Sequence, residues 1–238
     1  MKTKKKIIFY AMSIMLTFCI FPSTYVFANP APISQAEPNY LELLKHNEAG
    51  DTYFVYNATD LNLVSKAVKS GNNFLHCEIK IMEDIDFNGN SFSPIGNSET
   101  PFFGDFNGNN HTINNIKASN EDKEYCGLFG YVGPYGIVRN LTLGKSSTII
   151  GNNYTGGIVG YNCGVIDHCC FKGNIICSDY NVENNNYTGG IVGYNAHTGY
   201  INNCRLSKSS KIFQTLENDQ YNIANIYGVN KGTASSCE

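Results

Sequence analysis

The sequence predicts an all-β protein, a parallel β-helix of about five to six stacked coils with a capping helix at its N-terminal end. Two observations support this prediction. The nonapeptide YTGGIVGYN occurs identically at 154–162 and at 187–195, so the chain contains copies of one structural unit. The units are short apolar runs bounded by Gly and Asn, which is typical of strands and not of helical repeats.

The first segment, residues 1–28, is expected to be a secretory signal peptide. Four lysines precede an apolar run at 7–20, and small or apolar residues lead to an expected cleavage after Ala28. A retained membrane anchor is the alternative, although the run is short for a spanning helix. We expect no membrane span once the segment is cleaved.

Residues 29–52 are expected to form a flexible leader, because their first part is Pro-rich and has no apolar period. Residues 53–74 are expected to form a cap made of one strand and one helix. The strand is 53–56, and Asn57 is expected to cap a helix whose apolar face carries Leu61, Val64 and Val68 and which ends at Gly71. The first coil of a solenoid needs such a cover.

Residues 75–238 are expected to form the repeats, beginning with an alternating strand at 75–87. A pattern of two apolar residues and Gly recurs at 102–104, 128–130, 158–160, 191–193 and, degraded, 226–228. A second pattern follows each copy, at 113–116, 138–141, 166–169, 201–204 and 234–237. Because both patterns recur together, we expect each pair to mark one coil.

Stacking of coils at about 4.8 Å predicts columns of equivalent residues. One column is expected to point inward and contains Ile113, Val138, Ile166, Ile201 and Ala234. A second inward column contains Ile116, Leu141, Cys169, Cys204 and Cys237. Between them, a polar bend column in left-handed geometry is expected at Asn115, Asn140, His168, Asn203 and Ser236, and Asp84 is expected to begin it one coil earlier.

The charge balance argues against nucleic acid as a partner. The formal net charge is -3, it becomes more negative when the signal-peptide lysines are removed, and neither Arg139 nor Arg205 lies in a basic cluster. No cofactor is expected. The expected partner is a host or cell-surface glycan or protein, and the chain is expected to be a monomer.

Nine cysteines are present, and Cys19 lies in the expected signal peptide. The other eight are Cys77, Cys126, Cys163, Cys169, Cys170, Cys177, Cys204 and Cys237. Those in the inward column are favoured as small buried hydrophobes, with a disulfide between stacked neighbours as the alternative. Pairing of Cys163 or Cys170 across a coil stays open, whereas zinc is disfavoured because paired C-x-x-C spacing is missing.

The succession of motifs resembles the GLUG-motif proteins. The strings are DIDF (84–87), PIG (94–96), PFFGDFNGNNHTINNI (101–116), GLFGYV (127–132), IVRNLTL (137–143) and the duplicated TGGIVGYN followed by x-G-x-I-x-x-C. The resemblance covers roughly 53–237. It implies a secreted bacterial protein with a right-handed β-helix, similar to adhesin-like proteins and to accessory regions of immunoglobulin-A-cleaving metallopeptidases. It implies no catalytic residues, and H-E-x-x-H and a wall-anchor motif are missing.

Two groups of charged residues are candidates for chemistry, each with a simpler structural explanation. The outward column is expected to contain Asn114, Arg139, Asp167, Asn202 and Ser235, with Arg139 and Asp167 forming a surface salt bridge. Asp84, Asp86 and Asp105 could form an acidic calcium or catalytic patch, but these sequences are also ordinary turn chemistry. We therefore assign no catalytic, cofactor or metal residue.

Tyr131, Tyr161 and Tyr194 fall in one column, continued by Val229. They are either a platform for sugars or a protein partner, or a ladder that stabilises the sheet, and the ladder is favoured. No ligand-binding residue is assigned from the sequence. The expected function is that of a secreted or surface-associated, non-catalytic, adhesin-like module or interaction scaffold. The alternatives are a polysaccharide-acting β-helix enzyme, or the N-terminal fragment of a larger surface protein or peptidase.

Overall fold

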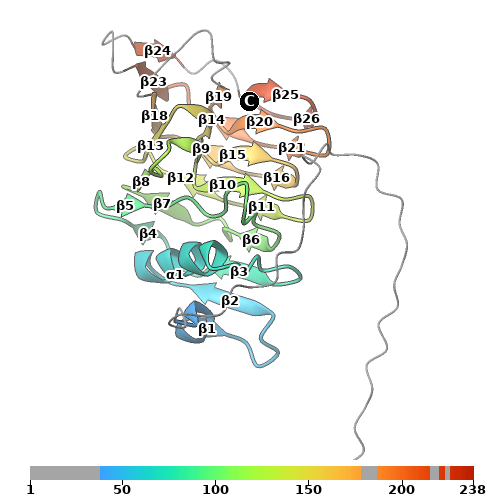
Figure 1. Ribbon diagram of the computed structural model, residues 1–238. Coiled ribbons are helices and arrows are strands. Elements are labelled where there is room, and N and C mark those ends of the chain that lie inside the picture. Colours follow the sequence, from blue (N-terminus) through green and yellow to red (C-terminus); the bar gives the residue numbers. More distant parts are fainter. Residues whose placement is uncertain (1–37, 178–186, 215–219, 223–225) are drawn as a thin grey trace, which may run out of the picture. The chain divides into compact units, whose positions relative to one another are not determined.

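The computed structural model describes residues 38–177, 187–214, 220–222 and 226–238, and the expected signal peptide lies outside them. The chain winds through five sheets in turn and then returns to the first (Figure 1). The first sheet contains β1 (Lys45–His46), β2 (Thr52–Val55), β3 (Glu78–Ile81), β6 (Asp105–Asn107), β11 (Ile137–Arg139), β16 (Val165–Asp167), β21 (Tyr200–Asn202) and β26 (Thr233–Ser235). The second contains β4 (Ile85–Asp86), β7 (Thr112–Asn114), β12 (Thr142–Leu143), β17 (Cys170–Phe171) and β22 (Arg205–Leu206).

The remaining three sheets complete each coil. The third contains β5 (Ser91–Phe92), β8 (Lys117–Ala118), β13 (Thr148–Gly151), β18 (Asn174–Cys177), β23 (Lys211–Gln214) and β24 (Gln220–Asn222). The fourth contains β9 (Glu124–Cys126), β14 (Asn153–Gly156) and β19 (Thr188–Gly189). The fifth contains β10 (Phe129–Val132), β15 (Val159–Asn162), β20 (Val192–Asn195) and β25 (Tyr227–Asn230). Neighbouring strands are parallel except β1 with β2 and β23 with β24. The predicted β-helix is confirmed.

The interior is a stack of apolar side chains contributed by the same position of each coil. Val138, Ile166 and Ile201 are aligned in register and fully buried, and Ala234 continues them, as predicted. The expected first member was wrong: Phe106 pairs with Val138, whereas Ile113 pairs with Leu143 in the second sheet. Parallel in-register stacking places each apolar side chain on its copy and excludes water from the core.

The corner between the first and second sheets is a left-handed turn in each of the later coils. Asn140, His168, Asn203 and Ser236 have φ of 55°, 50°, 49° and 51°, which confirms the expected bend column. Asn115 also has a positive φ but belongs to the next corner, because it follows β7. Asp84 is not among the residues with positive φ, so it does not begin the column.

A longer corner explains why the earliest coil was misaligned. The segment 108–110 makes the turn between β6 and β7, and Asn109 and Asn110 both have positive φ. The Asn110 amide donates to the Asn140 carbonyl at 2.8 Å, so these two residues occupy equivalent corners. Ile116 therefore precedes β8 in the third sheet and is not equivalent to Leu141.

The anchor of the earliest coil also differs from the expectation. Ile95 pairs with Phe129, and the Gly130 amide donates to the Ile95 carbonyl at 2.9 Å. The segment 94–96 is thus the copy of the later anchors, whereas Gly104 lies just before β6, where its carbonyl accepts from Ile137. The alternating stretch 75–87 is two strands, β3 and β4, in two different sheets.

The cap contains α1 (Ala58–Lys69), which lies across the end of the stack near β2 and β3 in Figure 1. The Asn57 side chain accepts from the Asp60 amide at 3.0 Å, and Asp60 accepts from the Tyr56 amide at 2.9 Å. Leu61, Val64, Ala67 and Val68 are buried, so the predicted helix and its apolar face are confirmed.

Ordered structure begins before residue 53. Within the expected leader 29–52, η1 (Tyr40–Leu43) is followed by β1, which pairs with β2, and Leu44 is only 3% exposed. Apolar residues at 40–44 give this segment surface to bury against the cap, which the Pro-rich residues before it lack.

Candidate binding face: the tyrosine array

Six tyrosines gather on the outer surface where the fourth and fifth sheets meet, and we call them the tyrosine array. One column follows the fourth sheet and the other lies on the fifth sheet. Their members are Tyr125, Tyr154 and Tyr187, and Tyr131, Tyr161 and Tyr194. All six side chains are half-buried. The second column was predicted from the sequence, and Val229 continues it as expected.

The rings stack within each column. Tyr131 and Tyr161 have centroids 4.7 Å apart, and Tyr161 and Tyr194 4.9 Å, with planes within 19° and 11°. In the first column Tyr125 stacks on Tyr154 at 4.9 Å, and Tyr154 contacts Tyr187 at 5.1 Å. Most contacts between the columns are edge-to-face, such as Tyr154 against Tyr161 at 5.4 Å and 70°, whereas Tyr125 and Tyr131 are tilted at 42°. The array is therefore one continuous aromatic cluster.

Glycine lets the two columns approach each other. Tyr125 and Tyr154 have φ of 52° and 48°, so each makes a local left-handed turn within its strand of the fourth sheet, β9 or β14. A Cβ at Gly160 would lie 2.5 Å from the Tyr154 carbonyl oxygen, so only Gly fits in β15 beside this turn. The alternating pleat then points Tyr161 outward, next to Tyr154.

The Asn that closes each nonapeptide forms a buried amide column. The Asn162 side chain donates to Asn195 at 2.8 Å, and Asn195 donates to Asn230 at 2.7 Å. Asn162 and Asn195 have no exposed surface. Asn162 also accepts from the Gly164 amide at 3.0 Å and fixes the corner after β15. Buried amides that satisfy one another hold the coils in register.

The hydroxyls of Tyr125, Tyr154 and Tyr194 are protonated donors and acceptors at neutral pH. Burial raises the pKa of Tyr125, Tyr154 and Tyr194 above the ordinary tyrosine value, and neighbouring tyrosines add to the effect. Because the rings stack along the column, ring faces inside the array are covered by other rings. The array therefore exposes ring edges and phenol hydroxyls to solvent, and not open ring faces.

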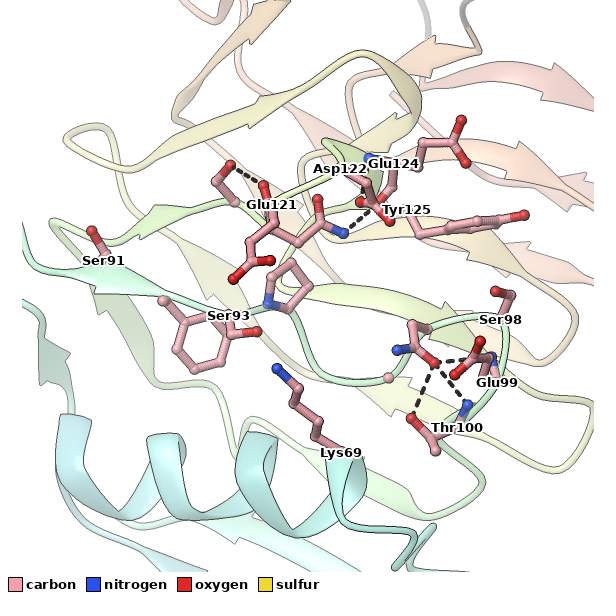
Figure 2. Close-up of a pocket in the computed structure, with 16 residues that line it drawn as sticks. Lys69, Ser91, Ser93, Ser98, Glu99, Thr100, Glu121, Asp122, Glu124 and Tyr125 are labelled. Atoms are coloured by element: carbon pink, nitrogen blue, oxygen red, sulfur yellow. Dashed lines mark hydrogen bonds between the residues drawn. The ribbon is translucent and has the colours of Figure 1, made fainter.

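A groove of about 800 Å³ lies beside the array, and Tyr125 forms part of its wall. Figure 2 shows Lys69 rising from the end of α1 toward this groove, with the turn at 98–100 and the segment 121–124 on its other walls. The Asn97 side chain orders the turn by accepting from the Glu99 and Thr100 amides at 2.9 and 2.7 Å. Glu99, Glu121, Asp122 and Glu124 make the groove acidic.

The sequence did not indicate that Tyr125, Tyr154 and Tyr187, the first column, are aligned. The sequence did contain a sign of this column, because each copy of the nonapeptide begins with Tyr and has another Tyr just before its final Asn. The spacing within one copy does not show that its two tyrosines meet, since a corner separates them. Only the fold brings the fourth and fifth sheets side by side.

The expected pair of Arg139 and Asp167 is replaced by another. Arg139 binds Asp105 through two hydrogen bonds of 2.9 and 3.0 Å and also binds Glu78 at 3.0 Å. Asp105 raises the pKa of Arg139. These carboxylates lie on earlier coils, because Ile137 pairs with Asp105, which pairs with Glu78.

The rest of the outward column is a polar ladder. Asp167 accepts from the Asn202 side chain at 3.0 Å, and Asn202 accepts from Ser235 at 2.7 Å. The register confirms Arg139, Asp167, Asn202 and Ser235 in one column. Asn114 was wrongly included, because it pairs with Asp86 in the second sheet and Asn107 takes its place.

The three aspartates of the possible acidic patch have separate partners. Asp84 accepts from the Thr112 amide at 2.8 Å and contacts His111 at 3.1 Å. Asp86 accepts from the Asn88 amide at 2.7 Å, which is turn chemistry, and from Asn115. Asp105 binds Arg139. Within the described ranges, no group of three or more His, Cys, Asp and Glu side chains is placed to hold a metal ion.

Cys77, Cys126, Cys169, Cys170, Cys204 and Cys237 are free thiols. Cys169 and Cys204 are buried and Cys237 is half-buried, in the column where small hydrophobes were expected. Cys163 lies beside the Tyr131 hydroxyl at 3.5 Å. Burial raises the pKa of Cys126 to about 12.

Comparison with known proteins gives two partial similarities. The chain is 35% identical over 119 residues to a protein of Evansella cellulosilytica named as a Gly-rich membrane protein; the match covers 49% of this chain and 14% of that protein. It is 36% identical over 88 residues to a protein of Haloquadratum walsbyi named Halomucin, covering 37% of this chain and 1% of that protein. No family model and no solved structure matches. None of the helices in the described part of the chain has the length and apolar character needed to cross a membrane.

Proposed function

We propose that this chain is a secreted or surface-associated, non-catalytic interaction module of the adhesin-like kind, and that it binds a polysaccharide through the tyrosine array. The observation that carries the proposal is the pair of stacked columns, with rings repeating at 4.7 and 4.9 Å in the fifth sheet. The array presents six large aromatic side chains on the outer surface of the fourth and fifth sheets. Tyrosine is enriched where proteins bind partners.

The regular spacing favours a polymeric ligand. Identical hydroxyls repeated once per coil match a ligand whose own polar groups repeat, and a polysaccharide is such a ligand. The ring stack keeps each hydroxyl in place before binding, so little side-chain entropy is lost on association. The acidic groove beside Tyr125 adds further acceptors for sugar hydroxyls.

The similarities are consistent with a surface role. One partial relative is named as a membrane protein and the other as a halomucin. The chain spans only 14% and 1% of these proteins, so units of this type occur inside much longer chains. The resemblance to GLUG-motif proteins and the expected signal peptide support the same proposal, including a location outside the cytoplasm.

The test is a glycan binding array followed by affinity measurement with a phenylalanine triple variant. In Tyr131→Phe/Tyr161→Phe/Tyr194→Phe the ring stack is retained and only the hydroxyls are removed. We expect roughly tenfold or greater loss of affinity, because a hydrogen bond contributes about 0.5–1.5 kcal/mol. Tyr135→Phe, on an exposed tyrosine outside the array, is the matched control and should bind normally.

Two results with the glycan would overturn the proposal, and a third would come from the binding partner itself. One is unchanged glycan affinity in the triple variant while its thermal unfolding matches that of the parent chain. The other is the appearance of new reducing ends or unsaturated products during incubation with the bound glycan, which would make the chain an enzyme. A binding partner found only among proteins would reject the polysaccharide as ligand.

A further inference from the structure

Three cysteines occupy the same position on three successive coils. Cys169, Cys204 and Cys237 each lie two residues after a member of the registered column Asp167, Asn202 and Ser235. Each directly follows the left-handed corner residue of its coil. Their thiols approach equivalent carbonyls of the preceding coil, those of Val138, Ile166 and Ile201, at 3.6, 3.7 and 3.9 Å.

The stacking brings neighbouring thiols within reach of each other. The Arg205 amide donates to the Cys169 carbonyl at 2.8 Å, and the Glu238 amide donates to the Cys204 carbonyl at 3.0 Å, so the coils are hydrogen-bonded at the cysteines themselves. Strands at about 4.8 Å satisfy the Cα separation of about 4.4–6.8 Å that a disulfide accepts.

Solvent access differs along the column. Cys169 is 1% exposed and Cys204 has no exposed surface, whereas Cys237 is half-buried. Cys237 belongs to the coil of β25 and β26, which are edge strands of their sheets among the described residues. A reagent in solution can therefore reach Cys237 first, and the nearest second thiol in the column is that of Cys204.

We propose that Cys204 and Cys237 are an oxidation site and form a disulfide that ties the coil of β26 to the coil of β21. The oxidant is a small-molecule disulfide of the glutathione type. The Cys237 thiolate attacks one sulfur of the reagent and releases one reagent thiolate. The Cys204 thiolate then attacks the Cys237 sulfur of the mixed disulfide and releases the second.

The exchange is balanced without another reactant. Two protein thiols lose two protons and two electrons, and the reagent disulfide is reduced to two thiols. Cys169 stays reduced because Cys204 can bond to only one neighbour. An exported chain would meet oxidants of this kind, since disulfides persist outside the reducing cytoplasm. The bond would join residues whose connecting segment runs once around the solenoid, so it would restrain the whole coil.

The test is incubation of the purified chain with oxidised glutathione, followed by alkylation of free thiols, proteolysis and mass mapping. We expect a peptide pair linked through Cys204 and Cys237, with Cys169 alkylated only after unfolding. Thermal unfolding should shift upward on oxidation and return after reduction. Cys169→Ser should form the same link, and Cys237→Ser should form none in the column.

Three outcomes would overturn the proposal. One is stable glutathione attached to Cys237 with Cys204 still reduced. Another is a Cys169–Cys204 link in the parent chain, because it would place the entry of the oxidant elsewhere. The third is a chain whose column thiols all remain free under these conditions. Mapping of the parent chain does not depend on whether any variant folds.

Discussion

At the scale of single residues, most positions of the duplicated nonapeptide have an identifiable physical role. Tyr154 makes a left-handed turn within β14, and Gly160 leaves room for the Tyr154 carbonyl beside β15. Tyr161 points outward, and Asn162 starts the buried amide column. Ile158 and Val159 fill the core. Identity over nine positions follows because inward, outward and close-contact positions alternate within one short segment.

Asn195 is the central member of the amide column, so its removal takes one hydrogen bond from each of two partners. We expect Asn195→Ala to lower the free energy of unfolding by about 1–3 kcal/mol, because the Asn162 donor and the Asn230 acceptor would lose their bonds in or near the core. Denaturant unfolding of the parent chain and of the Asn195→Ala variant measures this difference in the free energy of unfolding.

Asn202→Ala is the matched control for that change. Asn202 also links two coils, through Asp167 and Ser235, but it is half-buried on the outer surface, where water can replace the lost bonds. Its cost should be below about 1 kcal/mol. Equal losses in the two variants would show that burial of the amide column contributes nothing special.

At the scale of elements, the columns predicted from the sequence were correct only where the corners between the first and second sheets have the same length. Val138, Ile166 and Ile201 were aligned correctly because the corners at 140, 168 and 203 each use one left-handed residue. The corner at 108–110 is longer, and the string at 113–116 resembles the next coil's corner by composition alone. A shift of this kind is invisible without the hydrogen-bond register.

The candidate site was predictable in part. Outward tyrosines of the fifth sheet follow from the repeat and the pleat, and the structure confirms them. Their partners in the first column needed the fold, because Tyr125 and Tyr154 lie in the fourth sheet and contact the tyrosines of the fifth sheet across a corner. The partners of Arg139 were missed for a related reason, since its true neighbours lie on coils whose alignment was wrong.

The capping helix gives a prediction at the same scale. Leu61 of α1 has no exposed surface and belongs to the main core, whereas Leu63 on the same helix is only half-buried. We expect Leu61→Ala to cost about 2–5 kcal/mol of unfolding free energy, because it leaves a cavity at the end of the stack. Chemical denaturation of each variant gives the value.

Leu63→Ala changes the same number of atoms in the same helix and serves as the control. Its expected cost is about 1 kcal/mol, because less apolar surface returns to water. If the two variants lost equal stability, α1 would not be covering the core as its burial indicates.

At the scale of the whole molecule, the described parallel strands of each coil pair only with strands of the two neighbouring coils, so most of the stability is spread along the stack as a sum of local contacts. The coils of β11 and β16 are covered on both sides and their core residues Val138 and Ile166 are fully buried. The coil of β26 is different. Ala234 and Cys237 are only half-buried there, and among the described residues that coil is covered on one side.

This difference predicts a gradient of hydrogen exchange along the solenoid. Amides of β11 and β16 should exchange slowly, at rates that report opening of several coils, whereas amides of β26 should exchange faster through local opening. Mass spectrometry of exchanged peptides measures both in one experiment. Oxidation of Cys204 and Cys237 should slow exchange in β26 and leave β11 unchanged, since the bond restrains only the coil it closes. Uniform exchange along the reduced chain would instead mean that the solenoid opens as one cooperative unit and that no coil is individually weak.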